Sequence, residues 1–178
     1  MPKGMQAIFT QVASGSASNI IFNNIPQNYT DLMILMSTRD QVTGTGTYIL
    51  PVFNNNSTAV YSQTNVYQSI TDYGTSVLGL RNTNTTYFGL ARLACNSSGS
   101  YWTSNMFSTI KILIPEYTTS KFKQITFDVT APNMTTNAYG ISTGGGLFKA
   151  NSPITRIDLP APANYVAGST FTLYGISR

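Results

Sequence analysis

Apolar and polar residues alternate along much of this chain, and that alternation predicts β-strands. At 168–176, Phe171 and Leu173 alternate with threonines and a tyrosine, a pattern typical of a strand with one buried face. Residues 31–38 are apolar at successive positions from Leu32 to Met36, so we expect a central strand covered on both faces. The further strands that the pattern predicts are 7–12, 18–25, 48–53, 86–95, 105–114, 121–130 and 154–159.

The two long segments 105–114 and 121–130 predict a hairpin, because only the six residues 115–120 separate them. Within the second segment the alternation slips between Phe122 and Ile125. A slip of this kind is typical of a β-bulge, in which one extra residue is inserted into a strand.

Two regions are harder to interpret. Gly144-Gly145-Gly146 lies between 139–143 and 147–149, which predicts the turn of another hairpin. Between 60 and 80 the apolar residues are irregularly spaced, and a short helix or 3₁₀ turn at 66–70 is one interpretation.

Short strands separated by turn clusters, with no helical periodicity, predict an all-β fold: an antiparallel β-sandwich, jelly-roll-like. No linker or repeat divides the chain, so we expect one domain over residues 1–178, with a short N-terminal arm at about residues 1–5. Because the last segment is so strand-like, we expect it to lie inside a sheet, with earlier strands paired on either side.

The composition is poor in charge. Hydrophobic residues make up 42% of the chain, but charged residues only 9%, against about 25% in typical proteins. The net charge of +4 comes from 10 Lys and Arg that form no basic run, so we expect no nucleic-acid partner. The 11 Tyr, 9 Phe and 6 Met match the residues enriched in protein interfaces. This composition favours a homo-oligomer or another protein partner.

The expected compartment follows from three features that the sequence lacks. Cys95 is the one cysteine, which excludes an intrachain disulfide. No apolar run reaches the roughly 18 residues of a membrane-spanning helix, and the N-terminus lacks a long apolar signal segment. We therefore expect a protein made in a cytoplasm, with no membrane partner.

Catalytic chemistry has few candidates in this sequence. The chain has no histidine, the commonest general base and metal ligand. Glycoside hydrolysis would need two carboxylates across a cleft, but none of the acids falls in a recognisable motif, and we interpret them as turn or surface residues. Those acids are Asp31, Asp40, Asp72, Glu116, Asp128 and Asp158. We expect no enzyme, no metal and no cofactor, and we interpret Cys95 as a buried small residue.

Tyr101 and Trp102, beside a Ser-rich loop, leave two interpretations open. They could stack against a sugar ring, or they could wedge into the core or into a neighbouring subunit. The wedge is the favoured interpretation.

A set of short motifs follows in order along nearly the whole chain. They are Ile25-Pro26 with Tyr29-Thr30-Asp31-Leu32, Val52-Phe53-Asn54 with Tyr61, Ile114-Pro115-Glu116-Tyr117 with Lys121-Phe122-Lys123, Ile154-Thr155-Arg156-Ile157, and 169–176. Together they resemble motifs that recur in virion structural proteins of tailed bacteriophages, cyanophages included.

The resemblance implies a non-enzymatic particle component. The expected function is a capsid decoration or cement protein, bound to the outside of the major capsid lattice as a homotrimer. The alternative is a tail or fibre-tip module that binds host surface carbohydrate through Tyr101 and Trp102. The chain has no shaft segment, which favours the compact decoration protein. The arm Met1, Pro2, Lys3, Gly4 and Met5 is the expected contact with the capsid or with a neighbouring subunit.

Overall fold

The computed structural model describes residues 4–42, 47–71, 74–90, 92–95, 105–131 and 141–178. The strands of this part of the chain are β1 (Gly4–Val12), β2 (Asn19–Phe22), β3 (Asp31–Asp40), β4 (Thr47–Tyr48), β5 (Val52–Phe53), β6 (Tyr61–Thr71), β7 (Gly74–Thr85), β8 (Arg92–Cys95), β9 (Ser108–Ile114), β10 (Lys123–Thr130), β11 (Ile141–Phe148), β12 (Ile157–Pro160) and β13 (Thr170–Ser177). None of the described residues forms a helix long and apolar enough to span a membrane.

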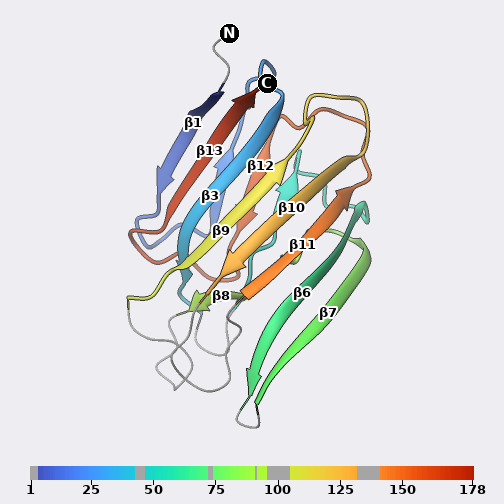
Figure 1. The fold of residues 1–178 in the computed structure, drawn as a ribbon. Helices are drawn as coiled ribbons and strands as arrows, with labels where there is room; N and C mark the ends of the chain where they lie inside the picture. The colour runs from blue at the N-terminus through green and yellow to red at the C-terminus, as the bar shows by residue number, and fades with distance from the viewer. Residues whose placement is uncertain (1–3, 43–46, 72–73, 91, 96–104, 132–140) are drawn as a thin grey trace.

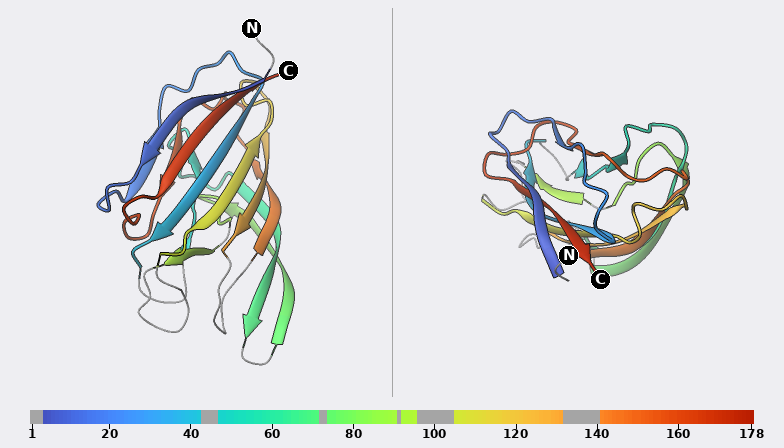
Figure 2. Two further views of the ribbon diagram at one scale, coloured as in Figure 1. Left: turned by 60° about the vertical axis from the view of Figure 1, so that its left-hand side comes forward. Right: turned by 90° about the horizontal axis from the view of Figure 1, so that it is seen from above.

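Two sheets make up the fold (Figure 1). The large sheet has the order β1-β13-β3-β9-β10-β11-β6-β7, and each neighbouring pair along this path is antiparallel. The small sheet has the order β2-β12-β5 and lies on the concave side of the large one (Figure 2). The short strands β8 and β4 extend the end of β3, where β8 pairs with it in parallel. The predicted class is confirmed: an all-β, antiparallel, jelly-roll-like sandwich.

The core fills the space between the two sheets. Alternate residues of β13, β3 and β9 point inward, so that Phe171, Ile34 and Ile112 are fully buried there. From the small sheet, Phe22 and Leu159 are buried against this layer. Burial of such side chains contributes about 1.5–3 kcal/mol each. The apolar residues that alternate in the sequence therefore hold the two sheets together.

The C-terminal strand lies inside the large sheet, as predicted, because β13 pairs with β1 on one side and with β3 on the other. The hairpin of β9 and β10 is also confirmed. The expectation that 31–38 is covered on both faces is wrong. In β3 the inward-facing Leu32, Ile34 and Met36 are buried, but Met33 and Leu35 on the outer face are only half-buried.

The interpretation of 66–70 as a helix or 3₁₀ turn is wrong, because these residues belong to β6, which pairs with β7 as a long hairpin. The strand was hard to recognise because its buried positions include polar residues. Gln63 and Asn65 alternate with exposed residues, as apolar residues would in an ordinary strand.

The interpretation of Gly144–Gly146 as a turn is also wrong, since the three glycines lie in the middle of the continuous strand β11. Packing explains two of them. A Cβ at Gly144 would lie 2.4 Å from the backbone oxygen of Thr64, and a Cβ at Gly146 would lie 2.5 Å from the Phe88 ring. Close approach, and not chain reversal, therefore requires glycine at these two positions.

Smaller differences concern strand ends and bulges. The predicted strand 48–53 is divided into β4 and β5, and 86–95 shortens to β8. The bulge expected in 121–130 is not present: β10 pairs with both neighbours without a register shift, and Phe122 lies before the strand. The register shifts occur instead at Ala7/Phe9 in β1 and beside Tyr61 in β6.

Candidate functional site

Residues from several of the sequence motifs meet at the end of the sandwich where the C-terminus lies (Figure 1). The buried hydroxyl of Tyr117, in the turn between β9 and β10, donates to the backbone oxygen of Pro26. The backbone oxygen of Tyr117 accepts from the amide of Ile154 at 2.9 Å. Gln27 donates to the oxygens of both Ile25 and Ile154, at 2.8 and 3.0 Å. Three distant segments are thereby tied together.

Asp31 anchors the C-terminus at the same end. Its carboxylate is buried and accepts two hydrogen bonds of 2.8 Å from the guanidinium of Arg178, a bidentate geometry that strengthens ion pairs. It also accepts from the amide of Glu116 at 3.0 Å. Nearby, the Tyr29 ring covers Gly175, where an added Cβ would lie 2.4 Å from the ring. The Tyr-Thr-Asp motif therefore fixes the end of β13.

A second group of motif residues joins β5 to the segment before β12. Asn54, whose φ of 53° lies in the left-handed region, donates to the oxygen of Pro153 at 2.8 Å. Its side-chain oxygen accepts from the amides of Thr155 and Arg156, at 2.9 and 3.2 Å. An asparagine tolerates this backbone conformation better than most residues. Its side-chain amide then supplies hydrogen bonds to backbone groups of 153–156 that lie outside the strands.

Tyr61 supports the same junction from β6. Its buried hydroxyl accepts from the amide of Phe53 at 2.9 Å and donates to the oxygen of Asn56 at 2.8 Å. Its ring lies 4.9 Å from that of Phe88 and 5.1 Å from that of Phe148, between ring centroids. Tyr117 and Tyr61 thus tie the large sheet to segments of the small-sheet layer, whereas Asp31 and Asn54 fasten segments within one sheet. The hydrogen bonds described here pair the polar side-chain groups of these residues within the protein.

The carboxylates are engaged in ion pairs with different cations. These pairs are Asp31–Arg178 at 2.7 Å, Asp158–Arg156 at 2.6 Å, Asp128–Lys111 at 2.8 Å and Glu116–Lys121 at 3.6 Å. Asp40 is buried and accepts from the amide of Val42 at 2.7 Å, and Asp72 lies outside the described residues. Hydrogen bonds from Lys111 and Thr143 lower the pKa of Asp128. A general acid needs the opposite shift.

Lys123 belongs to one of the sequence motifs, but the sequence around it does not indicate that its side chain is buried. The side chain is 1% exposed, and its ammonium group donates to the backbone oxygens of Thr119 at 2.6 Å and Ser152 at 3.2 Å, and to that of Lys121. Burial lowers its pKa. The group ties the β9–β10 turn to the segment after β11, whereas the neighbouring Lys121 is exposed and pairs with Glu116.

The expected contact residues are placed only in part. Met1, Pro2 and Lys3 lie outside the described residues, as do Tyr101 and Trp102. Gly4 and Met5 begin β1 and pair with Ser177 and Ile176, so the strand starts inside the expected arm. Cys95 ends β8.

The outer face of the large sheet carries an apolar patch near the end of the sandwich where the C-terminus lies. The register aligns Ala7, Tyr174, Met33 and Leu113 in one outward-facing row across β1, β13, β3 and β9. Met5 is exposed and lies opposite Ile176 in the next row. We call Met5, Ala7, Met33, Leu113 and Tyr174 the outer patch. The sequence does not indicate this patch, because its pattern predicts that Met33 is covered on the outer face as well.

No protein-family model matches the chain, and no curated protein matches it either. Among the described residues, no group of three or more Cys, Asp and Glu side chains is placed to hold a metal ion.

Proposed function

We propose that this chain is a non-enzymatic structural protein of a phage virion, a capsid decoration or cement protein bound to the outside of the major capsid lattice. The observation that carries the proposal is the convergence of the motifs. Segments that resemble phage virion proteins are far apart in sequence, yet contacts join Ile25–Gln27 to Tyr117 and Ile154, and join Asp31 to Glu116 and β13. A shared framework of this kind is what a resemblance in fold requires.

The outer patch supports attachment to another protein. Apolar side chains on a sheet face are a typical docking surface when they are contiguous. The patch includes Met5 and adjoins Gly4, the two described residues of the expected N-terminal arm. We propose that the arm and the outer patch contact the major capsid protein, and that copies of the chain associate as a homotrimer. The charge-poor composition supports both contacts.

The proposal predicts how a deletion and substitutions in the chain alter its attachment to capsids. Purified protein is added to capsids that lack it, and the bound fraction is measured by co-sedimentation. Removal of Met1 to Met5 should leave the sandwich folded but lower occupancy. Exchange of Met33 and Leu113 for threonine should also lower occupancy, by about tenfold, the equivalent of about 1.4 kcal/mol. The matched control is Val77→Thr on β7, an exposed apolar residue away from the patch, which should bind normally.

Salt separates apolar from charged attachment. At about 1 M salt the screening length falls to about 3 Å, so an attachment made by apolar burial and backbone hydrogen bonds should persist. Ready release by salt, with normal binding of the arm deletion and of the patch variant, would contradict the proposal. Analytical ultracentrifugation at micromolar concentration tests the trimer, and a monomer both in solution and on the particle would refute it.

A further inference from the structure

Gly145 is a glycine that the fold does not require. Its neighbours in β11 are held to glycine by contacts of 2.4–2.5 Å, but a Cβ at Gly145 would meet only the backbone oxygen of Ile125, at 3.4 Å. Glycine weakens the interior of a strand, and often marks a place where a ligand or another backbone approaches closely. The residue therefore calls for an explanation outside the packing of this chain.

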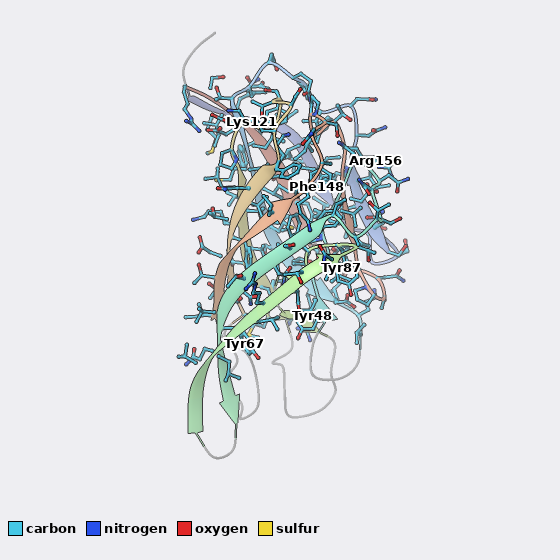
Figure 3. The ribbon with its side chains drawn as sticks, turned by 90° about the vertical axis from the view of Figure 1, so that its right-hand side faces the viewer. Tyr48, Tyr67, Tyr87, Lys121, Phe148 and Arg156 are labelled. Carbon is cyan, nitrogen blue, oxygen red and sulfur yellow. The ribbon has the colours of Figure 1, made fainter. Side chains whose placement is uncertain are left out.

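The missing side chain opens a hollow on the outer face of the large sheet. Gly145 lies between Thr126 of β10 and Thr64 of β6, and the hollow extends across β7 with a volume of about 550 Å³. The four strands lie side by side in the order β10-β11-β6-β7, with β6 and β7 foremost in Figure 3. Small-molecule sites in proteins typically measure about 300–1,000 Å³, so the hollow has room for a ligand.

Most of the described side chains that line the hollow are polar, and Arg81 carries the one charge among them. Hydroxyl groups of Ser62, Thr64, Thr83 and Thr126 and the amide of Gln124 line it, together with the guanidinium of Arg81. In the part of the chain that the structure describes, none of these side chains has a hydrogen-bond partner in the protein, whereas Thr143 on the same face donates to Asp128. Their hydrogen-bonding groups are therefore available to a ligand.

The described part of the hollow's lining has one positively charged side chain and no carboxylate. Arg81 is exposed and has no ion pair among the described residues, and no carboxylate lines the hollow. A guanidinium binds a carboxylate through two parallel hydrogen bonds. Leu147 and Pro115 add apolar surface at the hollow, against which the C–H groups of a sugar ring can pack.

We infer that this hollow binds a saccharide that carries a carboxylate. Several neutral donors and acceptors around one guanidinium match a ring with many hydroxyl groups and a single acid. An acidic peptide, with its many charges, would find only one cation here. The inference goes beyond the proposed function and does not depend on it, since binding of a saccharide by the purified chain requires no particle.

The test uses the purified full-length chain and isothermal titration calorimetry. The probes are trigalacturonic acid and its methyl ester, 3′-sialyllactose and lactose, and a triglutamate peptide. We expect at least one acidic saccharide to bind with a dissociation constant of about 1 mM or tighter, and its neutral counterpart to bind at least about tenfold more weakly. No particle is involved, so failure here is distinct from failure of capsid attachment.

Two variants test the hollow itself. Gly145→Val fills it, and should lower affinity at least about tenfold. Arg81→Gln should lower the affinity for the acid to that for the neutral counterpart. The control is Gly79→Val in β7, where an added Cβ meets nothing within 4 Å and which does not line the hollow. It should bind as the parent does. Circular dichroism checks that each variant is folded, and Arg81→Gln alters only an exposed side chain.

Four results would overturn the inference. They are absence of binding by both acidic saccharides, equal binding of an acid and its neutral counterpart, normal binding by a folded Gly145→Val and by Arg81→Gln, and tighter binding of the triglutamate peptide than of either acidic saccharide. The last result would assign the hollow to an acidic protein segment.

Discussion

Removal of the hydroxyl group of Tyr61 tests whether the junction of the two sheets depends on that group. Tyr61 is fully buried, and its hydroxyl is the hydrogen-bond acceptor for the amide of Phe53 at 2.9 Å. It also donates to the oxygen of Asn56 at 2.8 Å. The Tyr61→Phe substitution keeps the ring within its aromatic cluster and deletes one oxygen atom.

The magnitude follows from the groups left behind. A buried donor that loses its partner costs about 1–3 kcal/mol, and the amide of Phe53 is such a donor. The ring contacts with Phe88 and Phe148 remain, so the loss of packing is small. We expect the free energy of unfolding to fall by about 2 kcal/mol, which for a domain of this size lowers the melting temperature by about 4–8 °C.

The assay is urea unfolding at pH 7 followed by circular dichroism, with the parent chain and Tyr87→Phe measured alongside. Tyr87 is 42% exposed, so the same atomic change there should alter the free energy of unfolding by less than about 0.5 kcal/mol. An unchanged slope against urea would show that the variants unfold from comparable states. Equal effects of the two substitutions, or no effect of Tyr61→Phe, would refute the role given to the hydroxyl.

Three further predictions concern stability. Burial raises the pKa of Tyr61 to about 12, above that of an unfolded tyrosine near 10. The stability that the neutral form of Tyr61 contributes is therefore present below pH 10 and lost between pH 10 and 12. The urea midpoint should fall over that pH range, and it should fall less in Tyr61→Phe. Lys123→Met should lower the free energy of unfolding by about 1–3 kcal/mol, because three part-buried hydrogen bonds from its ammonium group to backbone oxygens are lost. Lys121→Met, at an exposed ion pair, should cost less than about 1 kcal/mol, and similar effects of the two substitutions would contradict the anchoring role of Lys123. Gly146→Ala should lower the melting temperature, because the added Cβ clashes with the Phe88 ring at a cost of about 1–3 kcal/mol. Gly145→Ala should be neutral or stabilising by up to about 1 kcal/mol. A larger loss of stability in Gly145→Ala than in Gly146→Ala would contradict the packing of β11.

The strands that sequence analysis placed well are those whose buried face is apolar throughout. In β13 the inward-facing residues from Phe171 to Gly175 are buried, as are those of β9, and nearly all of them are apolar. Local alternation in the sequence therefore indicates their position directly. β6 was not recognised because Gln63 and Asn65 take inward positions. Gln63 is satisfied there by hydrogen bonds with both backbone groups of Gly89, a partner that cannot be identified from the sequence around it.

The glycines of β11 show a second limit. Glycine predicts a turn when only neighbours in sequence are considered, but the need for it here comes from Phe88 and Thr64, which are distant in the chain. The contacts of the candidate site likewise depend on residues that are distant in the chain. The sequence identified the acids but not the cations that pair with them, and it gave no sign of a hollow formed by the absence of a side chain at Gly145.

The most direct test of the central claim is electron cryomicroscopy of intact particles that contain this chain. The proposal predicts density for the sandwich at regular positions over the outside of the capsid, in groups of three. The outer face of β13, β3 and β9 should lie against the shell. Density for the sandwich at the tail alone, or none on the particle, would contradict the assignment as a capsid decoration protein.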